Sequence, residues 1–132
     1  IHEAFVGAEY VAVASPLTEE TRGLIGRDEL QTLPPSAVLV NVARGPIVVE
    51  DALLDALRQG AIAGAAMDAF DEEPLPSDHP LWDAPNFLVT PHTSFLSPRN
   101  LDRILDEFEA NLTRFLAGDG LANALREPEL GY

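Results

Sequence analysis

The chain has 132 residues, 46% of them hydrophobic, which is enough for one domain with a buried core. It contains no cysteine, so disulfides, thiolate metal sites and cysteine nucleophiles are excluded. Twenty-two acidic residues face eight basic ones, which gives a net charge of -14. Such a surface repels phosphate backbones, so nucleic acid is not an expected partner.

The excess of acidic residues has two interpretations. The acids are scattered along the chain, which is typical of an ordinary solvated surface. Alternatively the protein is halophilic, since molar salt shortens the Debye length to ~3 Å and screens the self-repulsion. No apolar run reaches the roughly 18 residues of a membrane span. The first residues also lack the pattern of a secretory signal. We therefore expect a cytoplasmic protein with no membrane partner.

The first half of the chain predicts two strands and two helices. Residues 10–14 and 37–41 are short apolar runs rich in β-branched residues, each followed by a turn that contains proline. One or two helical turns are expected at 28–33. A longer helix is expected at 50–59, with an apolar stripe on one side and Gly60 at its C-terminal end.

The second half predicts two further strands and a long helix. Residues 62–68 form a strand of small side chains, and 86–89 form a fourth strand. Between them, residues 70–85 are expected to be a loop without regular structure. The last helix should start at an N-cap, Ser97, with Pro98 in its first turn, and end at Gly118.

Strands that alternate with helices at short spacing predict a parallel sheet with both faces covered. In such sheets ligands bind beyond the carboxyl ends of the strands, so polar residues at those ends are the candidates for function. These residues are Ser15, Asn41 to Arg44, Asp68 and His92.

Two of these candidates could bind a polar ligand. The Arg44 guanidinium could hold a carboxylate with two parallel hydrogen bonds, or it could satisfy carbonyls of its own loop. Asp68 could contact a ligand, or it could cap the turn that follows its strand. The residues alone leave both alternatives open for each side chain.

A histidine and a glutamate could exchange protons. His92 directly follows a strand and could act as an acid or base near neutral pH, although a lone histidine is often structural. Glu73 precedes Pro74 in the predicted loop and could orient that imidazole. The three histidines are dispersed, so no metal site is expected.

Several motifs follow one another along the chain. They are Ser15-Pro16-Leu17-Thr18 with Thr21 and Gly23, Val40-Asn41-Val42-Ala43-Arg44-Gly45, Ala52-Leu53 through Ala56-Leu57 and Gly60, Gly64 through Phe70 with Glu73-Pro74, His79-Pro80-Leu81-Trp82, and Thr90-Pro91-His92. In this order and spacing the chain resembles the D-isomer-specific 2-hydroxyacid dehydrogenases, a family that includes phosphoglycerate dehydrogenase and the glyoxylate and hydroxypyruvate reductases.

The resemblance implies a fold and a division of the chain. The fold is α/β, with the C-terminal half of a Rossmann-type doubly wound parallel sheet in residues 1–96. A long amphipathic helix and tail in 97–132 would return toward a substrate domain absent from this chain. The family's glycine-rich phosphate turn would lie upstream of Ile1, which suggests a fragment. Where many relatives carry a small residue or glycine after the histidine, this chain has Thr93-Ser94-Phe95-Leu96. We expect Phe95 to pack under the last helix rather than to narrow the pocket.

The resemblance also implies roles for individual residues. Arg44 would bind the substrate carboxylate, His92 would be the acid or base, and Glu73 would be its carboxylate partner. The cofactor would be NAD or NADP. The residues expected to bind it are Ser15, Pro16, Thr21, Val42, Ala43, Arg44, Asp68, His92 and Ser94.

The expected function is an oxidoreductase that transfers a hydride between the nicotinamide cofactor and a small 2-keto or 2-hydroxy acid. The resemblance further implies a homodimer. Two alternatives remain open at this point. One is a non-catalytic module on the same fold that senses NAD(H) or binds other proteins, and the other is an incomplete fragment that is inactive alone.

Overall fold

The computed structural model describes residues 1–124, and the expected tail beyond them lies outside the described residues. The chain divides into one compact unit of residues 1–94 and a second that starts at Phe95. No helix among residues 1–124 is both long and apolar enough to span a membrane.

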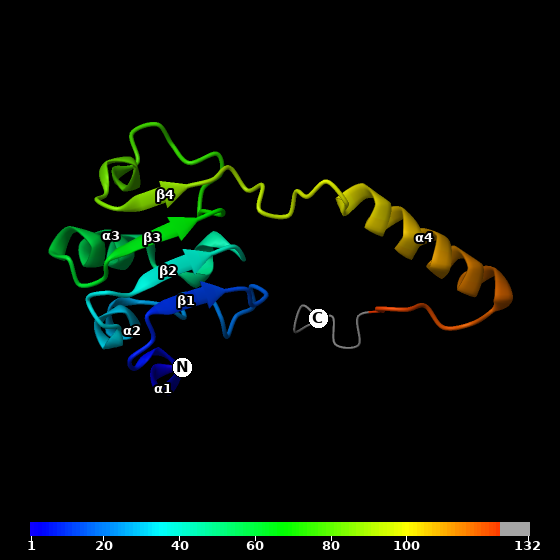
Figure 1. The fold of residues 1–132 in the computed structure, drawn as a ribbon, viewed down its shortest axis with the longest axis horizontal. Coiled ribbons are helices and arrows are strands. Elements are labelled where there is room, and N and C mark those ends of the chain that lie inside the picture. The colour runs from blue at the N-terminus through cyan, green and yellow to red at the C-terminus, as the bar shows by residue number, and fades with distance from the viewer. Residues whose placement is uncertain (125–132) are drawn as a thin grey trace. The chain divides into compact units, whose positions relative to one another are not determined.

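The first unit contains a four-stranded parallel sheet (Figure 1). Its strands are β1 (Tyr10–Val13), β2 (Val38–Asn41), β3 (Gly64–Met67) and β4 (Phe87–Val89). They lie side by side in the order in which they occur in the chain, and each pairs in parallel with the next. The predicted α/β fold with a Rossmann-type parallel sheet is therefore confirmed, with strands slightly shorter than expected.

Two helices of the first unit match predicted ones. They are α2 (Arg27–Thr32) and α3 (Glu50–Gln59). The expected end of α3 at Gly60 is confirmed, because Gly60 adopts the left-handed conformation with a φ of 65°. A short N-terminal helix, α1 (His2–Phe5), was not expected.

The predicted loop 70–85 is not wholly irregular. It contains a short 3₁₀ helix, η2 (Pro80–Asp83), and another one, η1 (Gly45–Ile47), follows β2. In η2 the His79 side chain accepts a hydrogen bond from the Leu81 amide at the start of the helix. A proline at the first position favours such a turn, since its fixed φ suits a helix start.

The core lies on one face of the sheet. Inward side chains of the strands, such as Leu39 and Met67, form one buried cluster with Leu30 of α2 and Leu53 of α3. The opposite face carries exposed or half-buried side chains, and Leu88 of β4 is 61% exposed. The expectation that both faces are covered is therefore wrong for the described chain.

The second unit contains α4 (Asn100–Ala117), which ends at Gly118 as predicted. Its predicted start was wrong, because Ser97 does not cap the helix. Instead, the Ser97 carbonyl accepts a hydrogen bond from the Asn100 amide, so residues 97–100 form a turn before the helix begins.

The apolar stripe of α4 is present but exposed. Of the 18 residues of α4, which the structure describes throughout, none is buried. Phe95, which we expected to pack under this helix, is 62% exposed, so that expectation is not met within residues 1–124. The stripe comprises Leu101, Ile104, Leu105, Phe108, Leu112, Phe115 and Leu116.

Candidate active site

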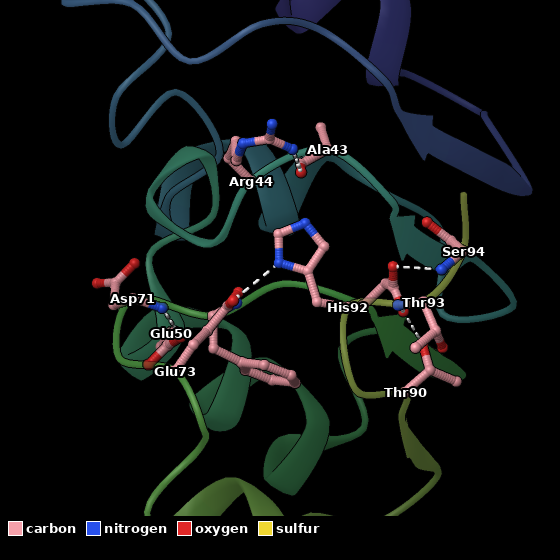
Figure 2. Close-up of polar contacts among 11 residues, drawn as sticks. Ala43, Arg44, Glu50, Asp71, Glu73, Thr90, His92, Thr93 and Ser94 are labelled. Carbon is pink, nitrogen blue, oxygen red and sulfur yellow. Dashed lines mark hydrogen bonds and ion pairs between the residues drawn. The ribbon is translucent and has the colours of Figure 1, made fainter. Parts of the chain in front are cut away.

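The carboxyl ends of the parallel strands bring several candidate residues to one edge of the sheet (Figure 2). Arg44 follows β2 after a short turn, Asp68 directly follows β3, and His92 follows β4. Glu73 reaches the same edge from the loop after β3. Side chains that are far apart in sequence therefore meet where a parallel sheet places its ligands.

Glu73 and His92 form a hydrogen-bonded pair. The Nδ1 atom of His92 lies 2.8 Å from Oε2 of Glu73. The side chain of His92 is 40% exposed and that of Glu73 is 37% exposed. The second oxygen, Oε1, accepts a hydrogen bond of 2.9 Å from the Phe70 amide. The Glu73 carboxylate is thus held by two donors, and one of them is the imidazole.

The electrostatics of Glu73 follow from these contacts. The hydrogen bond from His92 lowers the pKa of Glu73 below its ordinary value, and the Phe70 amide lowers it further. Partial burial opposes this shift, while the charges of His92 and Arg44 add to it. Glu73 is therefore ionised at neutral pH, and Arg44 is close enough to influence it.

His92 has an unusual backbone conformation. Its φ is 53°, in the left-handed region that residues other than glycine seldom adopt, although asparagine, aspartate and histidine adopt it more often than the rest. The residues that follow it are held by Asp68, whose carboxylate accepts hydrogen bonds from the amides of Thr93 (2.9 Å) and Ser94 (2.8 Å). The hydroxyl of Thr90 also donates to Asp68, at 2.5 Å. Asp68 therefore fixes the turn that presents the His92 imidazole.

Asp68 is only 3% exposed, and burial alone would raise its pKa. The hydrogen bonds from Ser94, Thr90 and Thr93 outweigh that effect and hold the pKa of Asp68 well below its usual range. Of the two interpretations that the sequence left open, the capping of the following turn is observed.

Arg44 stands on the turn between β2 and η1. Its Nη1 atom donates a 2.8 Å hydrogen bond to the Ala43 carbonyl, and the residue is exposed. The turn itself is built by Asn41, which is fully buried. The Asn41 side chain accepts from the Ala43 amide and donates to the Arg44 carbonyl, at 3.0 and 2.9 Å. Asn41 was expected at the end of a strand, but no role was predicted for its side chain.

A cavity of about 370 Å³ lies beside the pair. Arg44 does not line this cavity and stands on the adjoining turn. The cavity therefore combines the acid–base pair with a mostly apolar wall, as small-molecule sites usually do. Its lining residues are Asp68, Phe70, Glu73, Pro74, Leu75, Trp82, Val89, Thr90, Pro91 and His92.

The remaining cofactor candidates lie at or near the same edge. Ser15 and Pro16 follow β1. The Thr21 hydroxyl donates to the Pro16 carbonyl at 2.8 Å, so it closes its own loop. Val42 is 44% exposed and Ala43 is buried. Ser94, also predicted, donates its amide to Asp68 at 2.8 Å.

These residues fit the nicotinamide end of a dinucleotide. The exposed Val42 side chain offers an apolar surface for a ring. Within residues 1–124, no three histidine, aspartate or glutamate side chains are grouped so that they could hold a metal ion.

The fold and the site place the chain among the α/β domains that bind a ligand at the carboxyl edge of a parallel sheet. The family model for "D-isomer specific 2-hydroxyacid dehydrogenase, NAD binding domain" matches residues 1–94. The chain therefore belongs to the D-isomer specific 2-hydroxyacid dehydrogenase family, as its motifs predicted. A nicotinamide dinucleotide, NAD or NADP, is accordingly confirmed as the cofactor class.

Two curated relatives illustrate the similarity. The chain is 49% identical to glyoxylate/hydroxypyruvate reductase B of Pectobacterium carotovorum over 85 residues, which are 64% of this chain and 27% of the relative. It is 38% identical to the glyoxylate reductase of Korarchaeum cryptofilum over 112 residues, or 85% of this chain and 34% of the relative. The chain thus spans only about a third of the length of these enzymes.

Solved structures agree with the fold. A D-isomer specific 2-hydroxyacid dehydrogenase from Xanthobacter autotrophicus, in complex with NADPH and MES, superposes with a TM-score of 0.88 at 43% identity. The match covers 99% of this chain and 53% of that one. The NADPH-dependent glyoxylate/hydroxypyruvate reductase of Sinorhizobium meliloti matches with a TM-score of 0.86 at 30% identity, over 99% of this chain and 42% of that one.

Proposed function

We propose that the whole protein transfers a hydride between NAD or NADP and a small 2-keto or 2-hydroxy acid of the D configuration. The observation that carries the proposal is the Glu73–His92 hydrogen bond of 2.8 Å, at a sheet edge where the Arg44 charge also acts on Glu73. A 2-keto acid needs a cation for its carboxylate and a proton donor for its carbonyl oxygen, and this edge offers both.

His92 is the proposed acid and base. Its Nδ1 atom faces Glu73, so Nε2 is the atom that remains to give a proton to the substrate oxygen. The ionised Glu73 stabilises the protonated ring and fixes its orientation until the transfer. In the oxidative direction the neutral ring removes the proton from the hydroxyl group. When bound, the nicotinamide cofactor supplies or accepts the hydride.

Arg44 is the proposed carboxylate-binding residue. Its guanidinium has five N–H donors, and among residues 1–124 only one hydrogen bond is seen, from Nη1 to the Ala43 carbonyl. The other donors suit a two-point contact with a carboxylate, which would also polarise the neighbouring carbonyl. Arg44 and His92 would then hold the two ends of one small substrate.

The proposal also covers cofactor binding, the C-terminal segment and the oligomeric state. Ser15, Pro16, Thr21, Val42, Ala43, Asp68 and Ser94 are proposed to contact the cofactor together with Arg44 and His92. Residues 97–132 are proposed to return toward a substrate domain outside this chain. The exposed apolar stripe of α4 supports this, since it would be buried there. The proposed homodimer rests on the resemblance to the family.

The test uses the full-length protein with glyoxylate, hydroxypyruvate and branched 2-keto acids, following the loss of reduced nicotinamide absorbance. His92→Asn is the preferred variant, because asparagine tolerates the left-handed backbone of this position better than alanine does. Turnover should fall by roughly 10²- to 10⁴-fold while the cofactor still binds. Full activity of the variant would refute the role of His92. Cofactor binding by the wild type without turnover on any of these acids would favour the sensing alternative.

A further inference from the structure

The loop that carries Glu73 is attached to the rest of the fold through few polar contacts, and Glu50 makes two of them. Glu50 is the first residue of α3, and its side chain is 13% exposed. Its Oε1 atom accepts a 2.9 Å hydrogen bond from the Asp71 amide, and Oε2 lies 3.4 Å from Nε2 of His79. One carboxylate therefore contacts both ends of the segment 71–79.

His79 is suited to donate to that carboxylate. Its Nδ1 atom accepts a hydrogen bond from the Leu81 amide at 3.3 Å, so the proton of the neutral ring is on Nε2. This is the nitrogen that faces Glu50. The contact with Leu81 also ties the ring to η2, so the end of the segment is fixed from both sides.

The position of Glu50 has an energetic cost. Burial raises the pKa of Glu50, and the hydrogen bond from Asp71 only partly offsets that shift. In contrast, Asp51 is next to it in the same helical turn and is exposed. Because burying a carboxylate is unfavourable, we infer that the contacts of Glu50 with Asp71 and His79 stabilise this part of the fold.

The Phe70–Asp71 peptide connects this anchor to the proposed catalytic residues. The N–H of this peptide, that of Asp71, donates to Glu50, and the Phe70 N–H of the preceding peptide donates to Glu73, which in turn binds His92. On its other side the peptide rests on Gly45, where any added Cβ would overlap the Phe70 carbonyl. Gly45 is the neighbour of Arg44, so this one peptide fixes the acid–base pair relative to the arginine.

We propose that Glu50, assisted by His79, is a positioning residue that holds the Phe70–Asp71 peptide and thereby sets Glu73 against His92. Glu50 does not line the cavity beside Glu73 and His92. The expected effect on turnover rests on the proposed function. The expected effect on the placement of Glu73 does not depend on it.

The experiment compares Glu50→Ala with Asp51→Ala in the full-length protein. Both changes remove one carboxylate from the same helical turn, but only the first removes the contacts with segment 71–79. Hydrogen exchange at the Phe70 and Asp71 amides should become faster in Glu50→Ala and stay unchanged in Asp51→Ala. The kcat should fall roughly ten- to 100-fold in Glu50→Ala, with KM and cofactor Kd nearly constant.

A second variant, Glu50→Gln, distinguishes the loss of these contacts from a general folding defect. Its amide oxygen can still accept from Asp71, so its exchange and kcat should lie closer to wild type than those of Glu50→Ala. Unchanged exchange at Phe70 and Asp71 in Glu50→Ala would overturn the proposal, whether or not the wild type is active. Faster exchange with unchanged kcat would also overturn it, while leaving the proposed function intact. An inactive wild type would instead refute the proposed function.

Discussion

At the scale of single residues, Asp68 stands out because a nearly buried carboxylate receives three hydrogen bonds from the turn after β4. A carboxylate whose pKa is held low in the folded state stabilises that state above its ordinary pKa. The stabilisation is lost as the pH falls through the folded pKa. Asp68 therefore links the stability of the His92 turn to its own ionisation.

Asp68→Asn tests this link. The variant keeps one acceptor oxygen but replaces the other with an NH₂ group, so a part-buried donor of the turn loses its partner. We therefore expect a loss of about 2 kcal/mol in the free energy of unfolding at neutral pH. The loss should shrink in strong acid, where the wild-type carboxylate itself becomes protonated. Urea unfolding at several pH values measures it. Asp55→Asn, which breaks a surface ion pair with Arg27, is the control and should cost less than about 1 kcal/mol. Equal losses in the two variants would contradict the role of Asp68.

Residue types at strand ends could be predicted from the sequence, but their contacts could not. Arg44, Asp68 and His92 were singled out because each follows an apolar run that predicts a strand, and parallel strands end at one edge. The role of Asn41 depends on a turn that folds back onto its own side chain. The role of Glu50 depends on an amide 21 residues further along the chain. The Glu50 contact leaves no trace in local sequence, whereas asparagine is typical of turns in which its side chain binds the backbone two residues on, so the Asn41 contact had a local signal.

At the scale of elements, the turn after β2 and the loop after β3 are in direct backbone contact. A Cβ added at Gly45 would overlap the Phe70 carbonyl and the Asp71 amide, which are backbone atoms that cannot rotate away. We expect Gly45→Ala to destabilise the protein by about 2 kcal/mol or more and to displace Arg44. Thermal unfolding measures the first effect.

A matched substitution controls for the change of residue type. Gly120 has open space where its Cβ would lie, so Gly120→Ala should leave the melting temperature nearly unchanged. A Gly45→Ala protein as stable as the Gly120→Ala protein would show that the two segments separate without cost.

Two predictions about elements failed for physical reasons. An apolar strand indicates burial but does not tell which of its two faces is covered, so the face that carries the exposed Leu88 could not be told from the strand alone. Serine followed by proline is a frequent helix start, yet Ser97 is used here in a turn that precedes α4. By contrast, the ends at Gly60 and Gly118 were predicted correctly, because a left-handed C-cap favours glycine strongly.

At the scale of the whole molecule, the net charge of -14 acts on every part of the surface. If the acidic surface is an adaptation to salt, screening should relieve the repulsion and stabilise the folded state. We expect a melting temperature that is several degrees higher in molar potassium chloride than in dilute buffer. Differential scanning calorimetry in the two solutions measures the difference. An identical melting temperature would favour the alternative of an ordinary solvated surface.

The strand order of the sheet has a consequence for how the chain folds during its synthesis on the ribosome. Strands that neighbour one another in space also follow one another in the chain, so synthesis presents each new strand to a partner that has already emerged. β4 comes last and brings His92, whereas Arg44 arrives with β2. A nascent chain therefore displays its proposed carboxylate-binding arginine well before its proposed proton donor, and the proposed chemistry must wait until β4 has docked.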